Sequence, residues 1–263
     1  MDSVGTGVVG SVVVAGSVAM VVDTSVEALV VLELHATAPI INAIVATTTG
    51  LHADVLRRDG SEAVPAWVYD RRMTGGYSIE PLTVDTWDAF AGLVERHNGI
   101  FGGCWCTYFH DCAEREPGYE GSRAFKKLMV ESGHAHAALV VIGDEAVAWA
   151  EYGTPDELPN IHHQKQYLAE ADVTPDYRIT CIFVDKRYRK HGYAKVALAG
   201  ALDQIAALGG GVVEGYPHEI GEKRMNNSFV YNGTRTMYEQ AGFEFVRSKG
   251  MNNTVMRRTI RPA

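Results

Sequence analysis

The chain has 263 residues, which is enough for one large domain or two small ones, and its hydrophobic share of 46% is ordinary for a globular protein. Its net charge of −8 argues against a nucleic-acid partner and suits a cationic amine as substrate.

Residues 1–76 differ from the rest of the chain in composition. They open with a tract biased toward Val, Ala, Gly and Ser, and its apolar run ends at Asp23, short of the roughly 20 residues of a membrane-spanning helix. The only charge before this run is Asp2, whereas a secretory signal requires a basic N-terminal region. We therefore predict no membrane association, a cytoplasmic location and a low-complexity, disordered extension, with an accessory domain as the alternative.

The ordered domain is expected over residues 77–263. Residues 77–83 alternate like a first strand, and Thr83 to Asp85 supply N-cap candidates for a helix that runs to about His97. A second helix is predicted over 122–131, and a hairpin of residues 137–142 and 146–152 follows it. The long segment 153–176 is predicted to be a functional or mobile loop with a short helix near 161–168.

Three of the four cysteines, Cys104, Cys106 and Cys112, lie between the first two predicted helices. The fourth is Cys181. With His110 the first three form the pattern C-x-C-x3-H-x-C, which could be imagined as a zinc site. The spacing matches no zinc knuckle, and Trp105 and Phe109 between these residues are expected to pack. Reduced thiols in a cytoplasmic protein are the simpler account, so we predict no metal.

A strand, a basic turn and a helix follow one another between Tyr177 and Ala207. The helix repeats apolar residues at three- and four-residue spacings, namely Val196, Leu198, Leu202, Ile205 and Leu208. It begins at Gly192, directly after the basic turn. Such a helix presents unpaired N–H groups and the positive end of its dipole, which suit a phosphate or pyrophosphate. The missing side chain at Gly192 would let this anion approach the backbone closely.

The C-terminal part completes the predicted elements. A further strand is expected from Val212 to Pro217, and a polar loop follows it. A last helix is predicted over 230–241 and ends at Gly242. Strands over 243–247 and 254–260 then form a hairpin whose turn includes Lys249.

Two blocks of sequence resemble the GNAT superfamily of acyl-CoA N-acyltransferases, and the resemblance extends over about residues 77–260. The segment Arg189-Lys190-His191-Gly192-Tyr193-Ala194 fits the signature R/Q-x-x-G-x-G/A that holds the coenzyme A pyrophosphate in this family. Residues 234–243 are similar to the family's final helix with its tyrosine and glycine stop. The resemblance implies an α/β (α+β) fold with a mixed, mostly antiparallel sheet of about six to seven strands flanked by about four helices.

The resemblance also implies a coenzyme site. Strand residues Phe183, Val184 and Asp185 would pair with the amides of pantetheine, and the Val184 N–H would bind the carbonyl oxygen that becomes negative during acyl transfer. The pyrophosphate would lie against Arg189, Lys190, His191, Gly192, Tyr193, Ala194 and Lys195. The aromatic segment 101–109 would either line the acceptor pocket or merely pack.

Two catalytic roles remain to be filled. Arg178 stands where many family members carry a glutamate that takes the proton of the amine, so we expect Glu214 to act as the base, directly or through water. Glu151 and His218 are weaker candidates, and a solvated glutamate without a catalytic role is the alternative. Tyr238 matches the family's tyrosine that protonates the departing thiolate, with a core tyrosine as the alternative. The asparagine often found seven residues before this tyrosine is replaced by Tyr231.

These residues imply an N-acetyltransferase that transfers an acetyl group from acetyl-CoA to a primary amine of a small molecule or peptide, by direct attack in a ternary complex. Acetyl-CoA would be the cosubstrate. The alternative is a non-catalytic acyl-CoA-binding regulatory module, which the missing glutamate favours and the retained Tyr238 disfavours. The sequence leaves the acceptor, the acyl length and the formation of a homodimer open.

Overall fold

The computed structural model describes residues 76–219 and 231–263, together with four short strands nearer the N-terminus. The chain divides into two compact units, Met1–Ala63 and Val64–Ala263. In the first unit β1 (Val13–Val14) pairs with β2 (Ser17–Val18), and β3 (Ala43–Val45) pairs with β4 (Asp54–Leu56), both antiparallel. The rest of the predicted extension 1–76, up to residue 75, lies outside the described residues, so its disorder stays a prediction.

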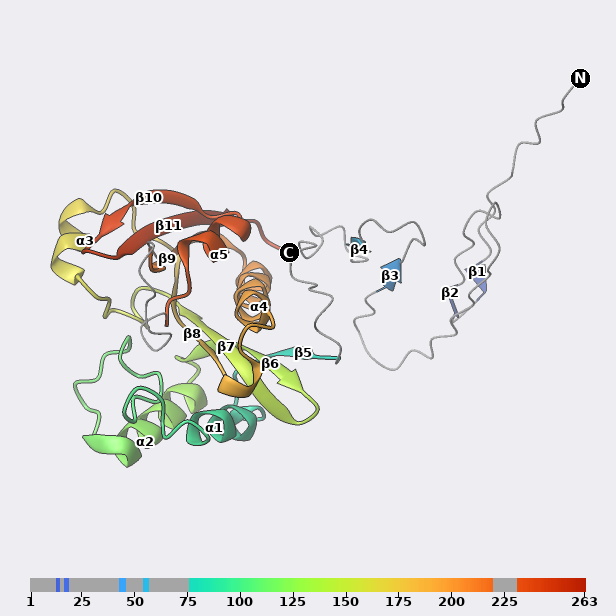
Figure 1. Cartoon of the computed structure of the whole chain (residues 1–263), viewed down its shortest axis with the longest axis horizontal. Coiled ribbons are helices and arrows are strands. Elements are labelled where there is room, and N and C mark those ends of the chain that lie inside the picture. Colours follow the sequence, from blue (N-terminus) through green and yellow to red (C-terminus); the bar gives the residue numbers. More distant parts are fainter. Residues whose placement is uncertain (1–12, 15–16, 19–42, 46–53, 57–75, 220–230) are drawn as a thin grey trace, which may run out of the picture. The chain divides into compact units, whose positions relative to one another are not determined.

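The second unit is built on one seven-stranded sheet (Figure 1). In chain order its strands are β5 (Ser78–Pro81), β6 (His136–Ile142), β7 (Glu145–Gly153), β8 (Tyr177–Val184), β9 (Gly211–Gly215), β10 (Glu244–Lys249) and β11 (Asn253–Ile260). Their order across the sheet is β10-β11-β9-β8-β7-β6-β5, and all neighbours are antiparallel except β8 and β9. The predicted mixed, mostly antiparallel sheet is confirmed.

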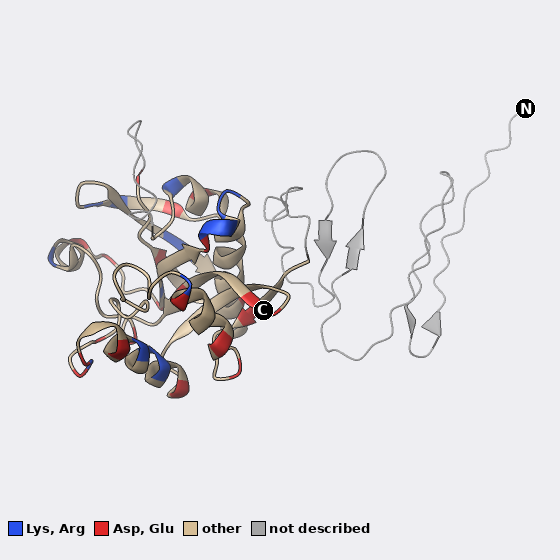
Figure 2. Ribbon diagram, turned by 60° about the horizontal axis from the view of Figure 1, so that its bottom comes forward, with Lys and Arg blue, Asp and Glu red and all other residues tan. Residues whose placement is uncertain are grey.

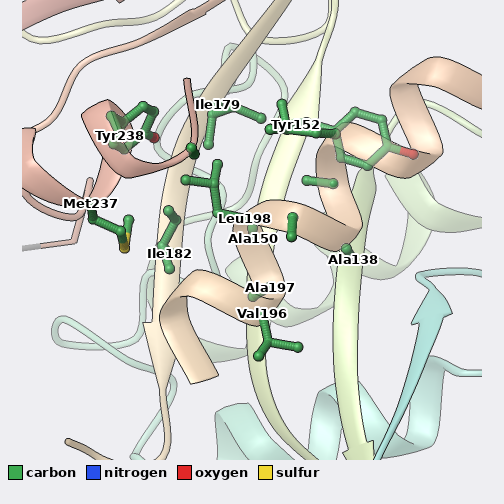
Figure 3. Close-up of a cluster of buried hydrophobic side chains, with 14 of the residues drawn as sticks. Ala138, Ala150, Tyr152, Ile179, Ile182, Val196, Ala197, Leu198, Met237 and Tyr238 are labelled. Carbon is green, nitrogen blue, oxygen red and sulfur yellow. The ribbon is translucent and has the colours of Figure 1, made fainter. Parts of the chain in front are cut away.

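Helices flank both faces of this sheet. They are α1 (Trp87–Glu95), α2 (Gly118–Glu131), α3 (Gln164–Glu170), α4 (Tyr193–Ala207) and α5 (Arg235–Gln240), with a 3₁₀ turn at Lys186–Tyr188. Figure 1 shows α1 and α2 on one side of the sheet and α4 on the other. Figure 3 shows the core on the α4 side, where Leu198 of α4 and Tyr238 of α5 face Ile179 and Ile182 of β8. Burial of these apolar side chains is the main force that holds α4 and α5 against the sheet.

Strands β8 and β9 separate partway along their length. They pair only over Tyr177–Ile179 and Val213–Gly215. On the other side of β8, Glu151 pairs with Cys181 while Tyr152 pairs with Ile179, so Thr180 is an extra residue that bulges from the ladder. Beyond Ile179, the edge of β8 that faces β9 is therefore open, because the parallel ladder has ended.

Three predicted elements differ from the structure. Helix α2 begins at Gly118, after Pro117, and not at Ser122. Helix α5 begins at Arg235 because the Thr234 side chain caps it by accepting a hydrogen bond from the Met237 N–H at 3.3 Å. Residues 231–233 are not helical, and position 230 lies outside the described residues. Leu208, expected on the buried face of α4, is 58% exposed because the helix ends at Ala207.

Basic and acidic residues alternate along the ribbon of the described domain (Figure 2). Within the described ranges, no helix is long and apolar enough to cross a bilayer. The four cysteines are free. No cluster of three or more His, Cys, Asp or Glu side chains suited to a metal ion occurs in the part of the chain that the structure describes.

Candidate active site

The open edge of β8 presents backbone groups on one side only. The Asp185 N–H donates to the Val147 carbonyl of β7 at 2.9 Å. Because backbone groups alternate in direction along a strand, Phe183 and Asp185 face β7, while Ile182 and Val184 face the opening toward β9. The Ile182 N–H already donates to the Tyr231 carbonyl at 2.6 Å. Of the three strand residues expected to pair with pantetheine, Val184 alone has its backbone groups on the open side.

The basic turn that follows β8 is held by Asp185, whose side chain is buried. Its carboxylate accepts hydrogen bonds from the Arg187 backbone N–H at 2.9 Å and from the Arg187 guanidinium at 2.9 Å, and it forms an ion pair with Arg96 at 3.4 Å. Burial alone would raise the pKa of Asp185, but the hydrogen bonds from Arg187 hold it at about 2. Asp185 is therefore an ionised anchor for the turn, and its side chain is not free to bind a cofactor.

The predicted pyrophosphate residues form the exposed end of this turn and the start of α4. Gly192 is the N-cap of α4 with φ 85°, a conformation that favours glycine, and no side chain caps the helix. Lys190 and His191 are exposed. Arg189 is half-buried, and its Nε donates to the Val184 carbonyl at 3.3 Å, which places this cation beside the open edge. Gly192, Ala194 and Lys195 are half-buried.

Tyr193 has a different environment from its neighbours in the turn. Its ring is buried between Tyr77 and Tyr188, with ring centroids 6.3 Å and 5.9 Å away. Its backbone N–H, at the first position of α4, is the group that could reach an anion. The structure thus brings the predicted phosphate-binding residues together at one helix N-terminus directly beyond the open edge of β8.

Tyr238 lies in the core on the α4 side of the sheet (Figure 3). Its ring is fully buried, makes a T-shaped contact with Phe243 at 4.9 Å and lies against Gly215, where any larger residue would collide with the ring. Its hydroxyl is buried without a hydrogen-bond partner among the described residues. Burial raises the pKa of Tyr238 far above its usual value, so the phenol keeps its proton.

Glu214, the predicted base, lies on β9 and is fully buried. One oxygen accepts hydrogen bonds from the hydroxyls of Tyr167 at 2.7 Å and Tyr216 at 3.2 Å. The other oxygen accepts from Nε and Nη2 of Arg257 at 3.1 and 2.8 Å. A carboxylate has about four acceptor positions, and these four bonds fill them. Glu214 therefore has no acceptor position left for an incoming proton.

Glu151, a weaker candidate for the base, is also buried, on β7. Its Oε1 lies 2.6 Å from Nζ of the buried Lys126 and 3.5 Å from Nε2 of His110, and its Oε2 accepts from the Thr180 hydroxyl at 2.7 Å. Burial alone would raise the pKa of Glu151, but the ammonium of Lys126 and the hydrogen bonds from His110 and Lys126 hold it at about 2. Glu151 thus ties α2 to the bulge of β8 at Thr180.

His218, the third candidate, lies just beyond β9. Its backbone is fixed by a hydrogen bond from its N–H to the Gly233 carbonyl at 3.0 Å and by another from the Arg235 N–H to its own carbonyl at 3.0 Å. Its ring is buried, and neither ring nitrogen has a partner among the described residues. Burial, with smaller effects from His162 and Lys249, lowers the pKa of His218 to about 4, so the imidazole is neutral at pH 7.

An aromatic cage lies between His218 and the loop that follows α1, and we define it as Phe101, Tyr108, Phe109, His162 and Tyr231. The Tyr231 ring has its centroid 5.9 Å from Phe101, 6.3 Å from Phe109, 5.5 Å from His162 and 5.3 Å from His218. Tyr108 stacks on His162 at 4.6 Å and is half-exposed, as is Phe101. The aromatic segment 101–109 therefore packs partly on itself. It also contacts the ring of Tyr231, whose carbonyl accepts a hydrogen bond from the open edge of β8.

Several residues of this region were not found by sequence reasoning. Lys126 and Lys249 are among the largest fully buried side chains, although lysine is rarely buried. The sequence gives no signal for Lys249, because a lysine beside a glycine is typical of an exposed turn. Tyr231 was noted only as a departure from the family pattern, and it proves to be the centre of the aromatic cage.

Residues 92–215 match the family model described as "Acetyltransferase (GNAT) family". No curated protein matches the chain. Among solved structures, an acetyltransferase from Thermus thermophilus is 13% identical over 70% of this chain and 96% of its own, with a TM-score of 0.40. The ribosomal-protein-S18-alanine N-acetyltransferase from Escherichia coli is 14% identical over 72% and 96%, with a TM-score of 0.37.

A third solved structure is an aminoglycoside 6′-N-acetyltransferase complexed with coenzyme A. It is 12% identical over 71% of this chain and 98% of its own, with a TM-score of 0.40. The resemblance to the GNAT acetyltransferase family that the sequence predicts is confirmed by the family model over residues 92–215.

Proposed function

We propose that residues 77–263 form an acetyl-CoA-dependent N-acetyltransferase that acts on a primary amine of a small molecule or peptide by direct attack in a ternary complex. The observation that carries this proposal is the continuity between the open edge of β8 and the N-terminus of α4. A pantetheine arm could pair with the backbone of Val184 as an added strand does. Its pyrophosphate would then meet the N–H groups of α4 and the cations of the turn.

Val184 and Tyr238 would act on the thioester. The Val184 N–H would donate to the carbonyl oxygen as it becomes negative, and the Tyr238 hydroxyl would donate its proton to the departing thiolate. In water this proton transfer is uphill by about 2 kcal/mol, because a phenol with pKa near 10 is a weaker acid than a thiol near 8.5. A thiolate held out of water is a stronger base, which favours the transfer.

We propose His218 as the group that takes the proton from the amine, in preference to Glu214. The four donors around Glu214 and the low pKa of Glu151 leave both carboxylates poor acceptors. His218 is neutral and its nitrogens are unpartnered among the described residues. A base of modest strength suffices here, because the nitrogen becomes much more acidic once it has attacked the carbonyl.

A non-catalytic acyl-CoA-binding module is the second candidate, and one observation favours it. The Tyr231 carbonyl occupies the N–H of Ile182 on the open edge, so part of that edge is already paired. A module of this kind would bind acetyl-CoA through the basic turn without releasing thiol in the presence of amines.

The test is to measure thiol release from acetyl-CoA with a panel of primary amines, together with the calorimetric affinity for CoA. Amine-dependent release would support the enzyme, and CoA binding without release for any amine would support the module. His218→Gln should lower kcat/KM by at least about a hundredfold, the smaller effect typical of acid–base catalysis. Glu214→Gln, the matched control, should lower the melting temperature and leave kcat nearly unchanged. A large loss of kcat in Glu214→Gln with an unchanged melting temperature, together with an active His218→Gln, would restore Glu214 as the base.

A further inference from the structure

Two buried cations near the aromatic cage lack a carboxylate partner in the described part of the chain. Lys249, at the end of β10, is 1% exposed, and its Nζ donates to the His162 carbonyl at 3.0 Å and lies 4.2 Å from the centre of the Tyr216 ring. Arg178 is 6% exposed and donates through Nη1 to the Leu158 carbonyl at 2.7 Å. Neither forms an ion pair with a described Asp or Glu, although a buried charge is costly unless it is paired.

The two cations act on each other electrostatically and contact the same pair of tyrosine rings. The Arg178 guanidinium is 5.5 Å from the centre of the Tyr167 ring, and the rings of Tyr167 and Tyr216 are 5.6 Å apart. The nearby carboxylates are already engaged, since Glu214 is saturated by Arg257 and the two tyrosines, and Glu170 pairs with Arg247 at 3.4 Å. The region therefore holds more buried positive than negative charge.

Unpartnered polar atoms are found in the same region. Nε of Arg178, both ring nitrogens of His218 and Oδ1 of Asn232 are buried without a hydrogen-bond partner among the described residues. Native proteins rarely leave such groups unsatisfied, so this cluster is a candidate place for a bound molecule. Nε of Arg178 needs an acceptor, Oδ1 of Asn232 needs a donor, and the neutral His218 ring needs one of each. Because the cations exceed the anions here, the missing partner carries negative charge together with a hydrogen-bond donor.

We propose that the acceptor amine also carries a carboxylate, as a free amino acid does, and that Lys249 and Arg178 bind this carboxylate at the inner end of the acceptor site. Lys249 supplies an ammonium and Arg178 supplies the free Nε–H, which suits a monoanion with two oxygens. His218 lies beside this position and next to Tyr231, whose carbonyl binds the edge of β8. The amine of the same molecule is thereby directed toward the thioester. The half-exposed rings of Phe101 and Tyr108 form the entrance.

The protonation of Lys249 provides a signal that does not depend on catalysis. Burial, with a smaller contribution from Arg178, lowers the pKa of Lys249 to about 7, and Arg247 acts in the same direction while Glu214 opposes it. Tyr216, His162 and His218 are further titratable groups that face Lys249. At pH 8 Lys249 is neutral in most protein molecules, and pairing with a carboxylate would protonate it. Binding of an amino acid should therefore take up a proton, whereas binding of the corresponding amine without a carboxylate should not.

The experiment is calorimetric titration at pH 8 in two buffers of different ionisation enthalpy, with and without CoA. The probes are three matched pairs: L-alanine and ethylamine, L-lysine and cadaverine, L-phenylalanine and phenethylamine. We expect at least one amino acid to bind tenfold or more tightly than its amine and with proton uptake. Lys249→Met should abolish the preference and the uptake, while Lys127→Met, at an exposed position on α2, should retain both. Melting curves establish that each variant is folded, and Lys249→Gln replaces Lys249→Met if the latter is not.

The inference rests on the proposed function, but the two can fail separately. If no amino acid binds more tightly than its amine, or if the preference persists in the Lys249 variant, the carboxylate site is refuted even when amines are acetylated. If an amino acid binds with Lys249-dependent proton uptake and yet no thiol is released from acetyl-CoA, the carboxylate site stands and the proposed acetyl transfer is refuted.

Discussion

Glu151→Gln is expected to destabilise the domain strongly, because it leaves the ammonium of Lys126 buried without its counter-ion. Both side chains are 1% exposed, and their charged atoms are 2.6 Å apart. Breaking one partner of such a pair costs about 3–5 kcal/mol of unfolding free energy. The double variant Lys126→Met/Glu151→Gln removes both charges, so it should recover about 2 kcal/mol of that loss.

The same pair predicts a dependence of stability on pH. The pKa of Glu151 is about 2 in the folded protein against an ordinary value of 4.5, so ionised Glu151 contributes about 3 kcal/mol of stability above pH 4.5. Because the folded pKa is depressed, this contribution is lost as the pH falls from 4.5 toward 2. About 1 kcal/mol of it should be gone by pH 3.5. The Glu151→Gln variant lacks this carboxylate and should lack this part of the acid sensitivity.

Urea unfolding followed by circular dichroism at pH 6 and pH 3.5 measures both effects, with Lys127→Met as an exposed lysine control that should change stability by less than about 0.5 kcal/mol. A Glu151→Gln variant within about 1 kcal/mol of the wild type at pH 6 would refute the reasoning. If that variant were stable and also lost kcat, Glu151 would be a catalytic base whose burial had been misinterpreted as structural.

Three further predictions concern the coenzyme site and the N-terminal extension. Tyr238→Phe should lower kcat by at least about a hundredfold while CoA affinity stays within about threefold, and full activity in a steady-state assay would show that another acid protonates the thiolate. Arg189→Glu should weaken CoA binding in calorimetry by at least about tenfold, one ionic contact with the pyrophosphate being worth about 1.4 kcal/mol or more. It is a cleaner test than a change at Gly192, whose φ of 85° strains any side chain. A chain that begins near Arg72 should melt at the same temperature as the full chain, and a large decrease would show that the extension packs on the domain.

The sheet and most helices could be predicted because their sequences carry strong local signals. Strand β8 is rich in β-branched residues, and α4 repeats apolar residues with helical spacing after Gly192. The start of α5 could not be placed, because Thr234 caps the helix only through a backbone conformation that the apolar pattern does not report.

The candidate site was only partly predictable, because its chemistry depends on which side chains share buried space. The basic turn and Tyr238 were found from local patterns. The saturation of Glu214 could not be found, since its partners Tyr167 and Arg257 come from α3 and β11, far away in the sequence. The burial of Lys249 depends on the His162 carbonyl, which is even more distant along the chain.

Strands β7 and β9, the two neighbours of β8, each carry a buried glutamate, and the two regions differ in their charge balance. On β7, Glu151 and Lys126 neutralise each other, with Thr180 and His110 filling the remaining hydrogen bonds. Near β9, Glu214 is matched by Arg257, which leaves Arg178 and Lys249 without a described counter-ion. A closed network stabilises a fold, whereas an excess of buried cations is tolerated only where something else brings the compensating charge. The distribution of charge across β8 thus separates a structural pair on one side from a candidate ligand site on the other.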